Sequence, residues 1–257
     1  MPSLPPLSRW TFYAATAGAA LVSVALAMGR VPSRVWPAAA IVAYVALVAL
    51  GLKKPSLRMF TDAIARAPDG AAMIVEVPAD ARAIESLCAL FEAHDGRATL
   101  ALSAEDAAAS RDALVAAIER GHALAITDRE AREHARTRGA AVDARIDRLE
   151  REHALLHAQF SQDFYPDLWL PSGLYTPALQ RLADAFDRTL VAPSHDLRGK
   201  SRFPLAERIE HDLEHGAILR VEDSPSLRAA LPAVLAAAAR LGVPVRALVS
   251  RDAAQEA

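Results

Sequence analysis

Apolar residues fall into two long uncharged runs near the amino terminus and a series of short runs beyond residue 71. Residues 10–28 and 35–52 contain no charged side chain, which gives runs of 19 and 18 residues. A helix rises about 1.5 Å per residue, so each run approaches the ~20 residues that cross the hydrocarbon core of a bilayer. Because the link over residues 29–34 is short, the pattern predicts an antiparallel transmembrane hairpin.

Two other interpretations of these runs remain open. A signal peptide would explain the first run, but a second run follows it without a clear cleavage site between them. Buried core helices would explain both runs, although uncharged stretches of this length are rare in soluble domains. Trp10, Tyr13 and Trp36 lie near the ends of the runs, where aromatic rings favour a membrane interface. We therefore expect the hairpin.

Beyond residue 71, short apolar runs alternate with amphipathic stretches of helical spacing. The runs typical of strands are Met73–Val77, Ala98–Leu102, Ala123–Ile126, Leu168–Leu170, Thr189–Ala192, Ala217–Val221 and Val243–Val249. The stretches between them predict helices at Ala81–Ala93, Ala104–Arg120, Arg129–Phe160, Thr176–Phe186, Leu205–His215 and Ser226–Leu241. This alternation favours an α/β fold, with a parallel sheet that is either open or closed as a barrel and helices outside it.

The charged residues are distributed unevenly, and their sign changes close to the place where the long apolar runs end. The first 58 residues carry six basic and no acidic residues, whereas the remainder carries 23 basic and 31 acidic residues. Four of the six basic residues flank the hairpin and two lie in its link. Basic residues close to a membrane span favour the cytoplasmic side, and more of them lie at the outer flanks than in the link. This distribution predicts an inner-membrane protein of two spans, with both ends and the acidic part facing the cytoplasm. The overall net charge of −2 argues against a nucleic-acid partner.

These patterns give an expected organisation of the chain. We expect a membrane anchor over residues 1–54, a linker over 55–70, an α/β domain over 71–250 and a short tail over 251–257. The lone Cys88 excludes a disulfide framework within the chain, and its place on an amphipathic stretch predicts a core position.

In α/β folds, functional side chains gather at the carboxyl ends of the strands. Here those segments and their neighbours resemble a known family. Asp95–Leu100 is similar to its "hgakATFF" segment, Ile118–Leu124 to "i..eGHeig", and Gly216–Asp223 to "GsIlLlHD", while Pro171–Gly173 is similar to the end of its Arg-Pro-Pro-Tyr-Gly motif. In order and spacing, residues 57–250 resemble the polysaccharide deacetylase (NodB-homology, carbohydrate esterase family 4) domain. The resemblance implies a deformed (β/α)7 barrel.

The family's reaction uses a divalent metal, usually zinc, together with a carboxylate base and a histidine acid. Its first motif, Thr-Phe-Asp-Asp-Gly-Pro, places Glu76 at the position of the base and Val77 at the position of a metal-ligand aspartate. Thr127 and Ala131 stand where the family has its two histidine ligands. Trp169 stands at the position of the motif arginine, and Glu222 at that of the catalytic histidine. The resemblance therefore implies a degenerate site with no metal cofactor.

The favoured hypothesis is a membrane-anchored, deacetylase-like pseudoenzyme. Its partner would be an envelope glycan, a lipid-linked sugar or an enzyme of envelope biosynthesis. The residues that could line its groove are Asp80, Asp128, Ser172, Tyr175 and Asp223. The competing hypothesis is an active hydrolase that deacylates N- or O-acetylated envelope sugars, with Glu76 as base and His134 or His122 as ligands of a relocated metal. An unrelated open α/β sheet is a third possibility.

Other constellations favour structural roles. Two histidine pairs have the i, i+4 spacing of a metal site, namely His153 with His157 and His211 with His215, but neither shows a third ligand. Surface positions on a charged helix face are the favoured interpretation of both pairs. Glu76 with Asp80, or Glu222 with Asp223, could form paired carboxylates with shifted pKa values. Inherited scaffold positions or acids at helix N-termini are the simpler interpretation of these pairs. Ser172 lacks the elbow motif of a serine hydrolase.

Overall fold

The computed structural model describes residues 35–53, 61–127, 140–171, 175–199 and 201–248. The chain divides into two compact units. The first unit comprises residues 1–63 and 174–182, and the second, which we call the barrel unit, comprises residues 64–173 and 183–257.

The first unit contains one long apolar helix. Helix α2 runs from Val35 to Lys53, which matches the second predicted run. Ile41, Val42 and Val45 expose between 55% and 68% of their surface. Within the described residues, no helix meets the length and hydropathy expected of a membrane span. The predicted span over residues 10–28 lies outside the described residues, so the hairpin as a whole stays a prediction from the sequence.

The barrel unit is built on parallel strands. They are β1 (Ala71–Glu76), β2 (Thr99–Leu102), β3 (Ala123–Thr127), β4 (Leu168–Leu170), β5 (Thr189–Leu190), β6 (His195–Asp196), β7 (Ile218–Glu222) and β8 (Val245–Arg246). Their order in the sheet is β5-β4-β3-β2-β1-β7-β6, and β8 pairs with the start of β1. The apolar runs predicted all of these strands except β6, which is only two polar residues long.

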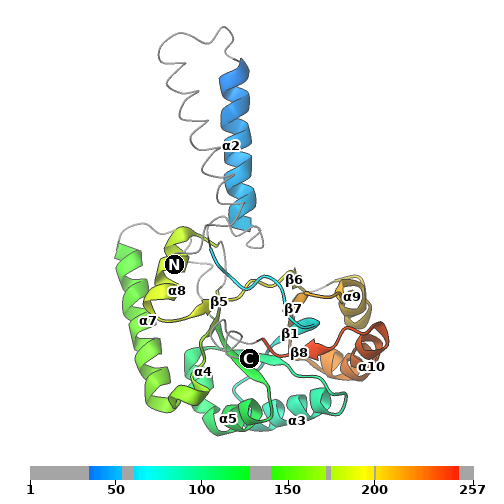
Figure 1. The fold of residues 1–257 in the computed structure, drawn as a ribbon. Coiled ribbons are helices and arrows are strands. Elements are labelled where there is room, and N and C mark those ends of the chain that lie inside the picture. Colours follow the sequence, from blue (N-terminus) through cyan, green and yellow to red (C-terminus); the bar gives the residue numbers. More distant parts are fainter. Residues whose placement is uncertain (1–34, 54–60, 128–139, 172–174, 200, 249–257) are drawn as a thin grey trace. The chain divides into compact units, whose positions relative to one another are not determined.

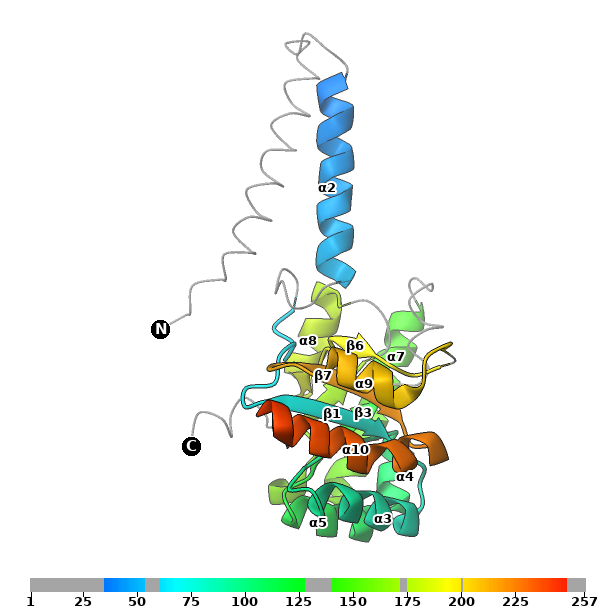
Figure 2. The same cartoon turned by 90° about the vertical axis from the view of Figure 1, so that its right-hand side faces the viewer.

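Helices cover the outer face of the sheet (Figures 1 and 2). They are α3 (Ala81–Glu92), α4 (Ala104–Ala109), α5 (Arg111–Glu119), α7 (Ala140–Gln159), the short η2 (Gln162–Phe164), α9 (Leu205–Asp212) and α10 (Pro225–Leu241), while α8 (Pro177–Ala185) crosses the boundary between the units. The single helix expected over residues 104–120 is wrong, because the backbone leaves helical geometry at Ser110 and starts a new helix at Arg111. The early part of the long helix expected from residue 129 lies outside the described residues.

Two apolar layers hold the barrel unit together. An outer core fills the space between sheet and helices and includes Met73, Val75 and Leu219. A smaller inner core lies on the concave face and includes Ile74, Leu168 and Ile218 among others. The sheet curls as a half-barrel, and among the described strands no ladder joins its two edges, β5 and β6. The expected parallel α/β fold of barrel type is confirmed, in this curled form.

Candidate functional site

Strand alternation places two charged residues on the inner face of the sheet. Ile74 in β1 and Ile218 in β7 belong to the inner core. Side chains two residues apart on a strand share a face, so Glu76 and Arg220 also point inward. Arg220 lies opposite Ile74 in the β1–β7 ladder. Its long side chain therefore needs to reach only a short way toward the carboxyl end of β1 to meet Glu76.

One oxygen of Glu76 accepts hydrogen bonds from two arginines. Arg198 Nη1 and Arg220 Nε each donate to Glu76 Oε1 at 2.8 Å, and Arg220 Nη2 contacts the same atom. Arg198 is held in turn by Asp196, whose two carboxylate oxygens accept from its Nε at 2.8 Å and its Nη2 at 2.6 Å. We call these four residues the Glu76 cluster. Its two carboxylates balance its two guanidinium groups.

The charges in this cluster stabilise one another. Burial by itself would raise the pKa of Asp196, but the hydrogen bonds and the charge of Arg198 outweigh burial and hold that pKa below its usual value. The hydrogen bonds that Arg198 donates to Asp196 and the charge of Glu76 likewise raise the pKa of Arg198 despite partial burial. The cluster is therefore a network of ionised, charge-assisted hydrogen bonds.

Two atoms of the cluster keep free hydrogen-bonding capacity. Glu76 Oε2 and Arg220 Nη1 have no hydrogen-bond partner among the described residues. Neither atom is among the fully buried polar atoms without a partner, so both reach solvent. Their side chains are otherwise well covered, with 20% of Glu76 and 6% of Arg220 exposed. An open acceptor and an open donor thus belong to one ion pair at the carboxyl end of the sheet.

This arrangement suits a polar ligand better than a metal ion. A carboxylate oxygen accepts and a guanidinium N–H donates, so together they complement hydroxyl or amide groups. Two guanidinium groups bonded to the carboxylate oppose the approach of a cation. Among the residues that the structure describes, no group of three or more His, Cys, Asp and Glu side chains could hold a metal ion. The described residues at this site therefore do not fit the divalent metal that the family's reaction uses.

The residues at the family's ligand and catalytic positions lie on different faces of the sheet. Val77 is buried in the outer core, so its side chain points away from Glu76. Trp169 is also buried and lies on the opposite face of β4 from the inner-core residues on either side of it. Thr127 is buried at the end of β3, where alternation turns it inward, and Glu222 is exposed beside Glu76 in the ladder. Ala131 lies outside the described residues.

Two of the acids proposed for the groove, Asp80 and Asp223, form structural contacts within the barrel unit. Asp80 caps helix α3, with its Oδ1 accepting from the Arg82 N–H at 3.0 Å. Asp223 binds Arg228 through both carboxylate oxygens at 2.8 and 2.7 Å, and these hydrogen bonds raise the pKa of Arg228. In the described contacts, Glu76 and Asp223 therefore pair with arginines and not with another carboxylate. Tyr175 is buried in the first unit, and Asp128 and Ser172 lie outside the described residues.

Sequence reasoning missed both arginines of the cluster. A signal for Arg220 was present, because it is the one charged residue inside the apolar run Ile218–Val221 and shares the parity of an inward position. The family segment "GsIlLlHD" has an apolar residue at that place. Arg198 gave no comparable signal, since it lies in a polar loop after a strand that was not predicted.

His122 has a structural role at the opposite end of the strands. It lies between α5 and β3, where its Nδ1 accepts from the Ala98 N–H at 3.1 Å. The proton must therefore lie on Nε2, which faces Glu92 Oε1 at 3.1 Å. Burial lowers the pKa of His122, although the carboxylate of Glu92 opposes this effect. His122 is thus placed away from Glu76, which makes it unsuitable as a metal ligand beside that base, and His134 lies outside the described residues.

The other histidine pairs do not form metal sites in the described residues. His211 and His215 are both exposed. His153 and His157 pack their rings edge to face, with centroids 4.3 Å apart, and Tyr165 donates to or accepts from His153 Nδ1 at 2.7 Å. The expected surface positions match His157, His211 and His215, which are exposed, whereas His153 is half-buried.

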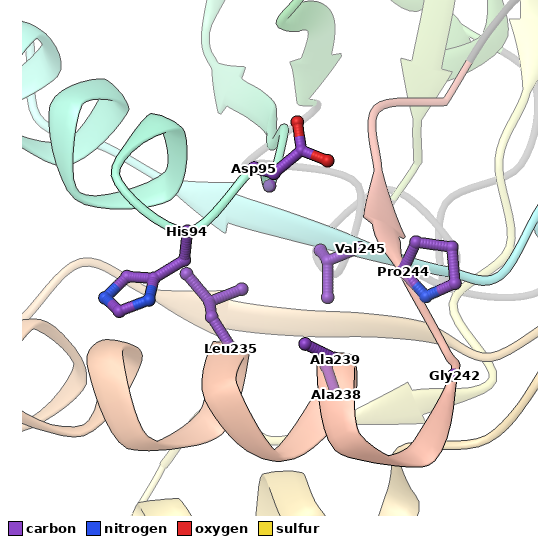
Figure 3. Close-up of a pocket in the computed structure, with 9 residues that line it drawn as sticks. His94, Asp95, Leu235, Ala238, Ala239, Gly242, Pro244 and Val245 are labelled. Atoms are coloured by element: carbon purple, nitrogen blue, oxygen red, sulfur yellow. The ribbon is translucent and has the colours of Figure 1, made fainter.

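A pocket of about 250 Å³ opens at the amino end of the sheet (Figure 3). Its walls come from the turn after α3, the last turns of α10 and the start of β8, and are mostly apolar, with Leu235 and Val245 among them. Val245 pairs with Ala71, the first residue of β1, so this pocket and the Glu76 cluster lie at opposite ends of the strands.

Solved structures to which this chain is similar include carbohydrate esterases of family 4. The wild-type family 4 pseudoenzyme from Bacillus anthracis aligns with a TM-score of 0.60 and 17% identity over 75% of this chain and 69% of that one. A mutant of that pseudoenzyme, described as having restored enzymatic activity, gives 0.59 and 17% over 75% and 72%. A family 4 esterase from Streptomyces lividans in complex with acetate gives 0.57 and 18% over 70% and 92%.

Comparison with protein-family models and with curated proteins finds no match. The structural likeness, at such low identity, establishes the deacetylase-type fold of the barrel unit.

Proposed function

We propose that this protein is a deacetylase-like pseudoenzyme that binds a neutral envelope glycan or lipid-linked sugar at the Glu76 cluster. The observation that carries the proposal is the double arginine contact to Glu76 Oε1, with Glu76 Oε2 and Arg220 Nη1 left open. Because two arginines bind Glu76 Oε1, Glu76 is not placed as a catalytic base beside a metal ion would be. The two open atoms supply hydrogen-bonding groups for a ligand.

Loss of hydrolysis follows from the residues around Glu76. The family reaction needs a metal-bound water next to the base. Here Val77 offers no ligand atom and lies in the outer core, and a guanidinium group occupies the region beside Glu76. Among the described residues, no cluster of ligand side chains replaces the missing metal site.

A sugar is the ligand that best fits the chemistry of the cluster. Its charges cancel, so it favours a neutral ligand over a strongly anionic one. Neighbouring hydroxyl and acetamido groups both donate and accept hydrogen bonds, which matches the open pair of atoms. The fold likeness to carbohydrate esterases supports the same class of ligand.

The membrane anchor is part of the proposal and comes from the sequence. Two uncharged runs over residues 10–28 and 35–52 would hold the barrel unit at the inner membrane, on its cytoplasmic side. The exposed apolar side chains of α2, such as Val42, are consistent with a lipid environment. Protease digestion in sealed vesicles of known orientation tests this: digestion of the barrel unit only in inside-out vesicles supports it, and digestion only in right-side-out vesicles contradicts it.

Calorimetric titration of the detergent-solubilised full chain with N-acetylated chito-oligosaccharide tests the ligand. We expect binding that weakens at least tenfold in Arg220→Leu and persists in Arg246→Met, a matched loss of a surface arginine that is 44% exposed. Absence of binding in the unsubstituted protein contradicts the glycan proposal, and co-purification with an enzyme of envelope biosynthesis would then support a partner-protein role.

A further inference from the structure

A buried cluster on the outer face of the sheet contains hydrogen-bond donors without acceptors. Trp169 lies in β4 and turns away from Leu168 and Leu170, which belong to the inner core. Arg188 directly precedes β5, the neighbour of β4. The side chains of Trp169 and Arg188 are both fully buried. This place lies on the other face of the sheet from the Glu76 cluster.

Four nitrogen atoms in this cluster lack a hydrogen-bond partner: Nε, Nη1 and Nη2 of Arg188, and Nε1 of Trp169. Glu152 Oε2 lies 3.9 Å from Arg188 Nη1, which is beyond hydrogen-bond distance. The other oxygen of Glu152 accepts from Arg148 Nε at 2.8 Å. The guanidinium carbon of Arg188 lies 5.8 Å from the centre of the Trp169 ring. This cation–π contact favours the charge but does not satisfy the N–H groups.

Tyr165 approaches the cluster without completing it. Its hydroxyl forms a hydrogen bond of 2.7 Å with His153 Nδ1, and its ring stacks on His157 with centroids 4.3 Å apart. Burial raises the pKa of Tyr165. The charge of Arg188 and a hydrogen-bonding effect on the phenol both oppose that rise, so the Tyr165 oxygen is an acceptor close to Arg188. No Arg188 N–H reaches that oxygen at hydrogen-bond geometry, however.

The chemistry of these donors defines the missing partner. Buried polar groups almost always have a partner, and an exception indicates an ion or a water molecule. Guanidinium and indole N–H groups can only donate, so the partner must accept. Glu152 neutralises Arg188 only from 3.9 Å and is shared with Arg148, so the buried guanidinium still favours an anion over a neutral acceptor. Because all four nitrogens are closed to solvent, the anion must also be small.

We propose that Arg188 and Trp169 form a binding site for a single halide-sized anion, probed here as chloride. The site is independent of the Glu76 cluster and of any glycan. It would tie Arg188, which precedes β5, to Trp169 in the neighbouring strand β4. A bound anion stabilises the folded chain in proportion to its occupancy, because the unfolded chain lacks the site.

Urea unfolding of the full chain in detergent tests the site, with chloride replaced stepwise by gluconate at constant ionic strength. We expect the midpoint to rise with chloride concentration in the unsubstituted protein, to be flat in Arg188→Met, and to rise normally in Arg246→Met. Trp169→Phe keeps the guanidinium but loses one donor, so its dependence on chloride should be weaker.

Crystals soaked in bromide provide a second readout that does not depend on a stable variant. An anomalous peak in contact with Arg188 supports the site, even if Arg188→Met does not fold. Equal unfolding midpoints in chloride and gluconate, with no bromide at Arg188, would overturn the proposal. The donors would then be satisfied by water or by a closer approach of Glu152.

Discussion

The two ends of the curled sheet each combine a carboxylate with basic groups, yet they differ in what remains open. At the carboxyl end, Glu76 and Arg220 keep one acceptor and one donor that reach solvent. At the amino end, both ring nitrogens of His122 are used, one by the Ala98 N–H and one by Glu92. Residue type alone therefore does not indicate a binding site. Hydrogen-bonding atoms that have no partner and are accessible to solvent do indicate one.

The largest expected effect tests whether the Glu76 cluster also carries stability. Arg220→Leu removes a guanidinium that is 6% exposed and leaves Glu76 with one cation. We expect a loss of about 3 kcal/mol in the free energy of unfolding, because breaking a buried ion pair strands its partner. Urea unfolding measures this. Adding Glu76→Leu to the same variant should recover part of the loss, and no recovery would contradict the paired description.

The amino end should respond differently to a comparable change. His122→Leu leaves the Ala98 N–H without its acceptor and removes one of the two partners of Glu92 Oε1, which keeps Arg120, so we expect a loss of about 2 kcal/mol in stability. Ligand affinity at the carboxyl end should stay unchanged. A drop in glycan binding by this variant, measured by calorimetry with the fold intact, would show that the two ends are coupled.

The dependence of stability on pH separates the two ends further. Burial holds the pKa of His122 below its ordinary 6.5, so the unfolded chain binds this proton more readily than the folded chain. Stability from His122 is therefore fully present above pH 6.5 and decreases as the pH falls. Asp196, whose pKa is lowered from 3.8, loses its contribution only in more acidic solution.

Urea midpoints measured between about pH 7.5 and about pH 5.5 report the histidine contribution. We expect the midpoint to fall over this window and the fall to be smaller in His122→Leu. Some dependence should remain, since burial also lowers the pKa of His153. An identical slope in the variant would contradict the assignment to His122.

The smallest expected effect concerns the exposed side of the Glu76 cluster. Arg198 is 22% exposed and its partner Asp196 is 46% exposed. Solvent screens such pairs, so Arg198→Ala should cost under about 1 kcal/mol of stability. A loss as large as that of Arg220→Leu would show that the loop after β6 is as important as β7 for holding Glu76.

Much of the fold was predictable from the sequence. Apolar runs located seven of the eight described strands because buried parallel strands are continuous in hydropathy. The polar pair His195–Asp196 gave no such signal, and the break at Ser110 lies inside an unbroken helical pattern. The position of Glu76 was predicted, but its partners were not. Arg198 lies 122 residues away in sequence, and no local pattern reports a contact that only the curled sheet creates.

We propose that Glu76 takes part in an arginine network and does not act as a metal-assisted base. Acetate release from N-acetylated chito-oligosaccharide by the full chain, with and without added zinc, tests it most directly. We predict no release above the blank in either condition and no change in Glu76→Gln. Zinc-dependent release that disappears in Glu76→Gln would contradict the claim and support an active deacetylase.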